Sequence, residues 1–183
     1  EGEAKGEDEA KGEDEPAITR LLFGSMTPRK ASESSPPLYE ELPPDHGALS
    51  ARMDEVLREM EPDGDLVTFQ AFQAAIRHIL RILRVLGMPG GHALLLGMCG
   101  SGRLTNTRIA AHIAGCQLHS MASMSFAGNE EWRAELKRVL QEARLAPVVL
   151  LLRDSLFSLV PDVGAIEDVN ALLGSNVPGV VRM

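Results

Sequence analysis

The chain has 183 residues and a formal net charge of −8, a length that accommodates one ordinary domain. Six of the eight net negative charges fall in residues 1–16, so the remainder is nearly neutral and gives no reason to expect a nucleic-acid partner. No apolar run approaches the roughly 20 residues of a membrane span, so we expect no membrane partner either. Cys99 and Cys116 lack the spacing of a metal site and fit a reducing compartment inside the cell.

The N-terminal region is acidic at first and then rich in proline. Residues 1–16 repeat a six-residue pattern with no apolar residue beyond alanine, so we predict disorder and favour a solvated linker over an acidic interaction tail. Prolines in residues 17–47 predict an extended connector with one apolar patch, Ile18–Phe23. We assign residues 1–37 to a disordered acidic and proline-rich segment. Because the chain starts inside a repeat without an initiator methionine, we expect a longer parent protein.

Residues 38–91 are predicted to be a helical lead-in to the core. Residues 48–60 place apolar side chains at helical spacing, and a longer helix is expected from Thr68, as the N-cap, to Leu86. The longer helix has an apolar face and an arginine face. The apolar face consists of Phe69, Phe72, Ile76, Ile79, Leu80, Leu83 and Leu86. The arginine face consists of Arg77, Arg81 and Arg84. Basic amphipathic helices also bind membranes or calmodulin-like partners, but we favour a packed helix with solvated arginines.

The next stretch, residues 92–115, has the pattern strand, glycine loop, helix. The apolar run Ala93–Leu96 predicts the strand, residues 97–102 (GMCGSG) the loop, and Leu104, Ile109 and Ile113 one side of the helix. Glycines let backbone N–H groups turn toward an anion, and a helix N-terminus adds partial positive charge. This arrangement is typical of a phosphate-binding loop, with the signature G-x-x-x-x-G-K-[ST]. Two glycines of this loop fit, but an arginine and a leucine replace the Lys and the Ser or Thr.

Strands and helices alternate in the rest of the chain. This alternation predicts an α/β parallel sheet with right-handed crossovers. Val148–Leu152 is a continuous apolar run, as expected of a central strand buried on both faces. Asp154 follows it, and in phosphate-loop proteins an acid at such a place holds the Mg²⁺ that bridges the β- and γ-phosphates. The other expected elements are a strand at Cys116–Met121, helices at Glu130–Leu145 and Ala165–Leu173, and a strand beginning near Val180, with Trp132 as a core or interface anchor.

Several of these stretches together resemble the fourth AAA+ module of dynein heavy chains. The resemblance covers about residues 38–180 and is strongest in FQAAIRHILRILRVLGMPGGHALLLGMCGSGRLTNTRIAAHIAGC, with support from YEELPPDHGALSARMDEVL, VVLLLRDSLF and IEDVNALL. Because the phosphate loop departs from the family pattern, the chain looks like part of a divergent dynein heavy chain domain-containing protein. The resemblance implies a P-loop NTPase (AAA+) core over residues 92–183, with a parallel sheet flanked by helices, incomplete and without its lid.

The resemblance also implies a nucleotide site. The residues that would bind ATP or ADP are Gly97, Gly100, Ser101, Gly102, Arg103, Leu104, Thr105 and Asp154, with Thr105 and Asp154 toward Mg²⁺ and no catalytic residue. Arg103 keeps the charge of the family's lysine but is longer and forked. Leu104 cannot ligate Mg²⁺, and Thr105 lies one residue after the position of the signature's Ser or Thr. Ser155 stands where most AAA+ ATPases have the glutamate that polarises water. We therefore expect weak nucleotide binding at best and negligible hydrolysis.

The function implied is that of a degenerate AAA+ module with structural or regulatory nucleotide binding, in a family of microtubule motor ATPases. Implied partners are neighbouring AAA+ modules of the same heavy chain, dynein intermediate and light intermediate chains, and microtubules; the implied location is cytoplasmic, in the cytoskeleton or the axoneme of a cilium or flagellum. The alternative is a scaffold or interaction module with a relic loop that binds no nucleotide. A stand-alone phosphate-loop kinase or GTPase is disfavoured because no guanine-recognition motif or lid is present.

Overall fold

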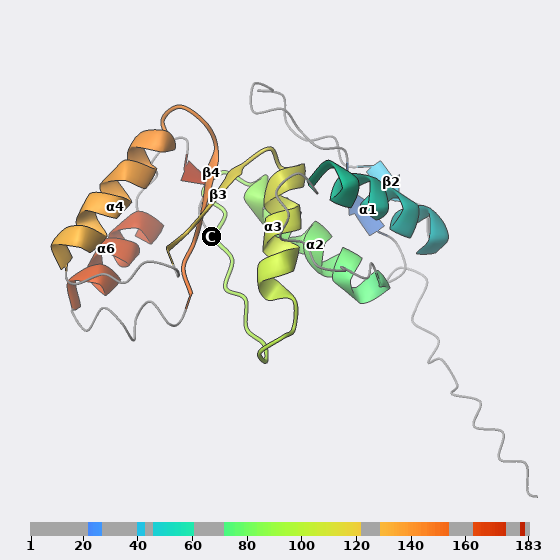
Figure 1. Cartoon of the computed structure of the whole chain (residues 1–183), viewed down its shortest axis with the longest axis horizontal. Helices are drawn as coiled ribbons and strands as arrows, with labels where there is room; N and C mark the ends of the chain where they lie inside the picture. The colour runs from blue at the N-terminus through green and yellow to red at the C-terminus, as the bar shows by residue number, and fades with distance from the viewer. Residues whose placement is uncertain are drawn as a thin grey trace, which may run out of the picture.

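The computed structural model describes residues 22–26, 40–42, 46–60, 72–121, 129–153, 163–174 and 180–181. In chain order the elements are β1 (Leu22–Gly24), β2 (Glu40–Leu42), α1 (His46–Met60), α2 (Gln73–Leu86), α3 (Arg103–Ile113), β3 (Gln117–Ser120), α4 (Asn129–Glu142), β4 (Val148–Leu151), α6 (Val163–Gly174) and β5 (Val180–Val181). The described residues thus form a mixture of helices and short strands, as Figure 1 shows. Among them, no helix combines the length and apolar character that a membrane crossing requires.

A parallel sheet of three strands divides the helices into two layers. The strand order is β3-β4-β5, so β4 is the central strand and pairs in parallel with both neighbours. Successive side chains of a strand point to opposite faces. Val149 accordingly joins the core formed by α1, α2 and α3, whereas Val148 and Leu150 join the core formed by α4 and α6. The predicted parallel sheet and its buried central strand are confirmed, with helices on both faces (Figure 1).

Helix α2 is the main packing element of the first layer. Its apolar face is buried against α1, α3 and β1, while Arg81 and Arg84 remain exposed, as expected for a packed helix with solvated arginines. Arg77, the third arginine of the predicted face, is half-buried. The predicted start of this helix is wrong at Phe72, whose side chain is 59% exposed and whose backbone is extended. The Phe72 carbonyl instead accepts hydrogen bonds from the N–H groups of Ala75 and Ile76, and so begins the helix from outside it. Thr68, the predicted N-cap, lies outside the described residues.

The N-terminal region contains a two-stranded antiparallel sheet that the sequence pattern did not predict. Strands β1 and β2 pair antiparallel, and Met26 just after β1 is only 3% exposed within the core. Gly24 lies so close to α2 that an added Cβ would be 2.6 Å from Leu80 Cδ2. The prediction of disorder is therefore wrong for residues 22–26, because glycine allows close packing on α2 and β2 supplies a backbone partner. The acidic repeat lies outside the described residues.

The prediction of a strand before the glycine loop is also wrong. Residues 91–98 are not assigned to any strand, and Leu94 and Leu96 are 85% and 83% exposed. Only Leu95 packs against the core, as the alternation of an extended chain allows. The apolar run predicted a strand, but no described strand pairs with this segment. Figure 1 shows it as an extended trace running from the end of α2 to the loop before α3.

The second layer is held by the single tryptophan of the chain. Trp132 of α4 is fully buried, and its Nε1 donates a hydrogen bond to Asp168 Oδ2 of α6 at 3.1 Å. Arg133 Nε donates to the same carboxylate oxygen at 3.1 Å. A buried indole needs a partner for its N–H group, and Asp168 provides it. The prediction of Trp132 as a core anchor is confirmed, and α4 ends at Glu142, three residues before the predicted end.

Candidate functional site

The glycine loop lies at the N-terminal end of α3, where the sequence pattern placed it. Gly100 and Gly102 both adopt left-handed backbone conformations, with φ of 79° and 75°. Residues other than glycine rarely take these values, so the loop depends on glycine at both positions. Gly102 is the N-cap of α3 and offers no side chain to satisfy the free N–H groups of the first helical turn. The expected loop and helix are thus present, and the helix begins with N–H groups available to an anion.

The loop is tight on one side and open on the other. A Cβ added to Gly97 would stand 2.9 Å from Ser101 Oγ, so only glycine fits there without a shift. The Ser101 N–H donates to the Met98 carbonyl at 3.2 Å and closes the turn. At Gly100, by contrast, an added Cβ would meet nothing within 4 Å. A phosphate group could therefore approach the loop from the Gly100 side.

Arg103 folds back across the loop. Its Nη1 donates to the Leu95 carbonyl at 3.4 Å and its Nη2 to the Met98 carbonyl at 3.3 Å. Its Cδ would be 3.5 Å from a Cβ on Gly97, so the side chain covers the corner between the extended segment and the loop. The guanidinium thus has protein partners, and its remaining N–H groups can still donate to an anion. Because hydrogen bonds from guanidinium to phosphate oxygens are stronger than those to neutral carbonyls, phosphate would compete for Arg103.

Of the other predicted binding residues, the structure describes Leu104 and Thr105 but not Asp154. Leu104 and Thr105 are half-buried in the first turn of α3, next to Arg103. Asp154, expected to hold Mg²⁺ together with Thr105, lies outside the described residues, as does Ser155. Strand β4 ends at Leu151, three residues before Asp154. The described part of the chain brings together no group of three or more His, Cys, Asp or Glu side chains that could hold a metal ion.

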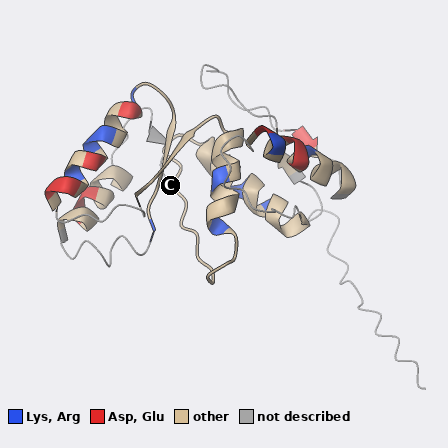
Figure 2. Cartoon of the chain, viewed as in Figure 1, with Lys and Arg blue, Asp and Glu red and all other residues tan. Residues whose placement is uncertain are grey.

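The helix that the glycine loop begins, α3, and its neighbour α2 are both basic. Helices α2 and α3 carry five arginines and no acidic residue; these are Arg77, Arg81, Arg84, Arg103 and Arg108. Figure 2 shows blue but no red on these two helices, whereas α4 carries both colours. Of these five arginines, Arg103 contacts the loop itself. Helix α1 of the same layer carries Asp54, Glu55 and Glu59, and Glu59 lies 3.8 Å from His112 of α3. The basic character therefore belongs to these two helices and not to the whole side of the molecule.

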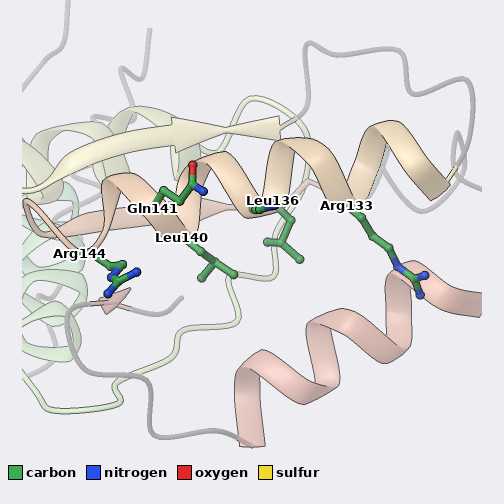
Figure 3. Close-up of a pocket in the computed structure, with 6 residues that line it drawn as sticks. Arg133, Leu136, Leu140, Gln141 and Arg144 are labelled. Carbon is green, nitrogen blue, oxygen red and sulfur yellow. The ribbon is translucent and has the colours of Figure 1, made fainter.

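A separate hollow lies along α4 and does not belong to this site. Leu136 and Leu140 line its apolar part, and Arg133 and Arg144 lie toward its two ends (Figure 3). Helices α3 and α4 cover opposite faces of the parallel sheet, so the hollow and the glycine loop are on different sides of it (Figure 1). Arg133 is already held by Asp168. The hollow therefore contributes nothing to a site at the glycine loop.

One residue near the loop was missed by the sequence analysis. Asn106 is 7% exposed, and its Oδ1 has no hydrogen-bond partner. Helical spacing was the available signal, because Asn106 precedes Ile109 and Ala110 by three and four residues and so shares their buried face.

The sequence as a whole matches known proteins. Residues 65–180 match the family model of the P-loop containing dynein motor region D4. The chain is 33% identical over 173 residues to dynein axonemal heavy chain 2 of Mus musculus, covering 88% of this chain and 4% of that protein. It is 31% identical over 168 residues to dynein axonemal heavy chain 3 of Homo sapiens, covering 89% and 4%. The dynein beta chain of the flagellar outer arm of Chlamydomonas reinhardtii is 26% identical over 137 residues, covering 74% and 3%.

Proposed function

The chain belongs to the dynein heavy chain family, and we propose that it serves there as a degenerate AAA+ module that binds nucleotide for a structural or regulatory purpose. It spans about 4% of the length of relatives such as dynein axonemal heavy chain 2, so the proposal concerns this region first. We take the P-loop NTPase fold of AAA+ proteins as its architecture, on the basis of the parallel sheet, the glycine loop and the family match.

The observation that carries the proposal is the left-handed pair of glycines at the start of α3. Gly102 caps α3 without a side-chain hydrogen bond, so the N–H groups of the first helical turn have no competing side chain. Such a helix start is an anion-binding arrangement, and Arg103 adds a fixed positive charge to it. In bound ATP or ADP, the phosphates would lie against these N–H groups. Thr105 and Asp154 are the residues proposed to face Mg²⁺.

Hydrolysis is proposed to be negligible. Leu104 is apolar where the phosphate-loop signature has a hydroxyl that ligates Mg²⁺. Ser155 follows Asp154 in the sequence, and a serine hydroxyl does not act as a general base near neutral pH. The site would therefore hold nucleotide without turning it over, as expected of a module whose nucleotide stabilises a conformation.

At the level of the whole protein, we propose participation in microtubule-based movement. The matched relatives are named as axonemal and flagellar outer-arm dynein chains, which supports a place in the axoneme of a cilium or flagellum. The proposed partners are the neighbouring AAA+ modules of the same heavy chain, the dynein intermediate and light intermediate chains, and microtubules.

A second candidate is a scaffold that binds no nucleotide. The observation in its favour is that the Arg103 guanidinium is already bonded to the carbonyls of Leu95 and Met98. These two bonds tie the extended segment to α3 without a ligand. In that case the glycine loop would be a relic whose present role is to join two parts of the fold.

Titration of the chain with a fluorescent ADP or ATP analogue, with and without Mg²⁺, tests the two candidates. We predict saturable binding that weakens about ten-fold or more in Arg103→Ala, because a hydrogen bond to a charged group is lost. Arg103→Lys should keep or strengthen the affinity, since lysine retains the charge and is the usual residue of the signature. Absence of saturation at millimolar nucleotide would contradict nucleotide binding and leave the scaffold.

A further inference from the structure

Two arginines on the outer side of α2 have no acidic partner. Arg81 and Arg84 are exposed, and within the part of the chain that the structure describes no ion pair joins either of them to an acidic side chain. Helix α2 itself contains no acidic residue, and Arg77 precedes Arg81 by one helical turn. We call Arg77, Arg81 and Arg84 the arginine stripe. Because like charges at helical spacing repel one another, an anionic partner would stabilise this stripe.

Strand β1 fixes the chain beside this stripe. It packs on α2, and the carbonyl of Phe23 accepts a hydrogen bond from Arg84 Nη2 at 3.3 Å. The acidic repeat, residues 1–16, is separated from Leu22 at the start of β1 by only five residues. A chain extends by at most about 3.5 Å per residue, so Glu15 lies within roughly 25 Å of Leu22. The 14 residues of α2 span about 21 Å, so the C-terminal end of the repeat is within reach of the stripe.

The repeat and the stripe are complementary in charge and in spacing. The repeat has eight acidic residues and two lysines, a net charge of −6, and it contains two acidic triplets, residues 7–9 and 13–15. In an extended chain, side chains two residues apart lie on the same side about 7 Å from each other. The Cβ atoms of Arg81 and Arg84 are about 5–6 Å apart on the helix. One triplet can therefore place two carboxylates opposite two guanidinium groups.

The short connection between the repeat and β1 makes up for the weakness of exposed ion pairs. Such pairs contribute little individually, because water competes for both charges. Two groups joined by a short connection, however, meet at an effective concentration on the order of millimolar. A contact with a dissociation constant in that range is populated within one chain, whereas it is rare between separate chains at micromolar concentration.

We propose that the acidic repeat of residues 1–16 binds the arginine stripe of α2 in the same chain and covers it as an intramolecular anion. The sequence alone favoured a solvated linker, but the position of β1 beside Arg84 favours this contact. The hollow along α4 is another basic surface, but it lies across the parallel sheet from β1. The contact uses no residue of the glycine loop, so it is independent of the proposed nucleotide binding.

A spin label in the repeat of the 183-residue chain tests this proposal by NMR. A nitroxide is attached at Gly12→Cys, between the two triplets, while Cys99 and Cys116 are replaced by serine so that one site is labelled. The label speeds the relaxation of nearby amide protons. We expect this effect at the amides of Arg81 and Arg84 in dilute buffer. It should fall about two-fold or more in about 0.5 M sodium chloride, which screens exposed charges.

Arg81→Glu and Lys137→Glu form a matched pair of variants. Both side chains are exposed on helices, and among the described residues neither makes a hydrogen bond or an ion pair. Both changes alter the net charge equally. Arg81→Glu should reduce the effect of the label on the α2 amides by about two-fold or more, because repulsion replaces attraction. Lys137→Glu should leave that effect unchanged. If Arg81→Glu does not fold, Arg81→Gln and the salt series provide the same comparison.

Three results would overturn the proposal. Proximity of the label to β1 alone would give an effect on α2 that neither salt nor Arg81→Glu changes. A stronger effect at the α4 amides near Lys137 would place the repeat in the hollow instead. An effect of equal size on isotope-labelled chains that carry no nitroxide, mixed with spin-labelled chains, would show that the contact joins two copies.

Discussion

Arg103 is the residue on which the chemistry of the glycine loop depends most. It preserves the positive charge of the phosphate-loop lysine, but its planar fork also reaches two carbonyls of the loop and the preceding segment. A lysine ammonium has three donors and no fork, so it would bridge the same carbonyls less well. With arginine in place of the lysine of the signature, part of the hydrogen-bonding capacity of the side chain is used for bonds within the protein instead of for an anion.

Gly102 offers the sharpest test of the loop backbone. Its φ of 75° is unfavourable for any residue with a Cβ, while an added Cβ would meet nothing closer than 3.8 Å. We predict that Gly102→Ala lowers the free energy of unfolding by about 1–2 kcal/mol through backbone strain alone. Chemical denaturation measures this change.

Gly174 is the matched control for that substitution. It ends α6 without a positive φ, and an added Cβ would meet nothing within 4 Å. Gly174→Ala should therefore leave the free energy of unfolding unchanged or raise it by up to about 1 kcal/mol. Equal stability of Gly102→Ala and the wild-type chain would contradict the left-handed start of α3.

Among single residues, the sequence predicted those that local chemistry defines. The glycines of the loop, Arg103 after them and Trp132 as an anchor follow from signature and composition. The burial of Asn106, whose Oδ1 lacks a partner, did not, because asparagine on a helix is usually exposed and its burial depends on packing against distant elements. The placement of Asp154 stays a prediction.

At the scale of elements, the sequence predicted helices more accurately than strands whose pairing partner is distant in the sequence. Helices α1 and α3 follow from apolar spacing within one stretch of sequence, which the fold does not need to supply. Strand β4 was recognisable because a continuous apolar run is typical of a strand buried on both faces. The antiparallel pair of β1 and β2 depends on contacts between residues about 20 apart, which no local pattern reveals.

The segment before the glycine loop shows that a local apolar pattern can also predict a strand that does not form. Residues 93–96 have the composition of a buried strand, yet the described sheet has no strand paired with them. Composition reports how well a residue suits a strand, but pairing decides whether a strand forms. The exposed Leu94 and Leu96 are the result of that missing pairing.

Helix α4 is tied to the sheet by a charged network. His119 Nε2 of β3 lies 2.7 Å from Glu135 Oε1, and Arg138 donates to both oxygens of the same carboxylate. Arg138 also pairs with Glu142 one turn later. The hydrogen bond from Arg138, followed by the bond to His119, holds the pKa of Glu135 below its ordinary value despite partial burial. The network thus favours the ionised carboxylate in the folded state.

This shift predicts a pH dependence of stability. A carboxyl whose pKa is lower in the folded state stabilises the fold above its unfolded pKa of about 4.3, and this contribution disappears as the pH falls through the folded value. Glu135→Gln should therefore be less stable than wild type near pH 6, and the difference should shrink below about pH 4. Denaturation curves across this range measure it.

Glu167, exposed on α6, supplies the control for the pH series. Glu167→Gln should change the free energy of unfolding by no more than about 0.5 kcal/mol at any pH in the range, as is usual for a surface substitution. A difference between Glu135→Gln and wild type that stayed constant from pH 6 to pH 3 would show that ionisation of Glu135 is not what stabilises the contact between α4 and β3.

At the scale of the molecule, the parallel sheet separates two layers with different surfaces. In the first layer α2 and α3 are basic and α1 carries both charges, and this layer holds the glycine loop. The layer of α4 and α6 has the apolar hollow, and its helix α4 carries both charges (Figure 2). Membership of the dynein heavy chain family places this arrangement in the D4 motor region. For that region we propose nucleotide binding that survives without catalysis.

The most direct test of that account follows binding and phosphate release in the same sample of the chain with ATP and Mg²⁺. We predict that ATP is bound saturably and recovered uncleaved, with phosphate release at the background rate, because Leu104 and Ser155 replace groups that hydrolysis requires. Phosphate release at the rate of an ordinary ATPase, on the order of 1 per second or faster, would contradict the account. So would the absence of bound nucleotide.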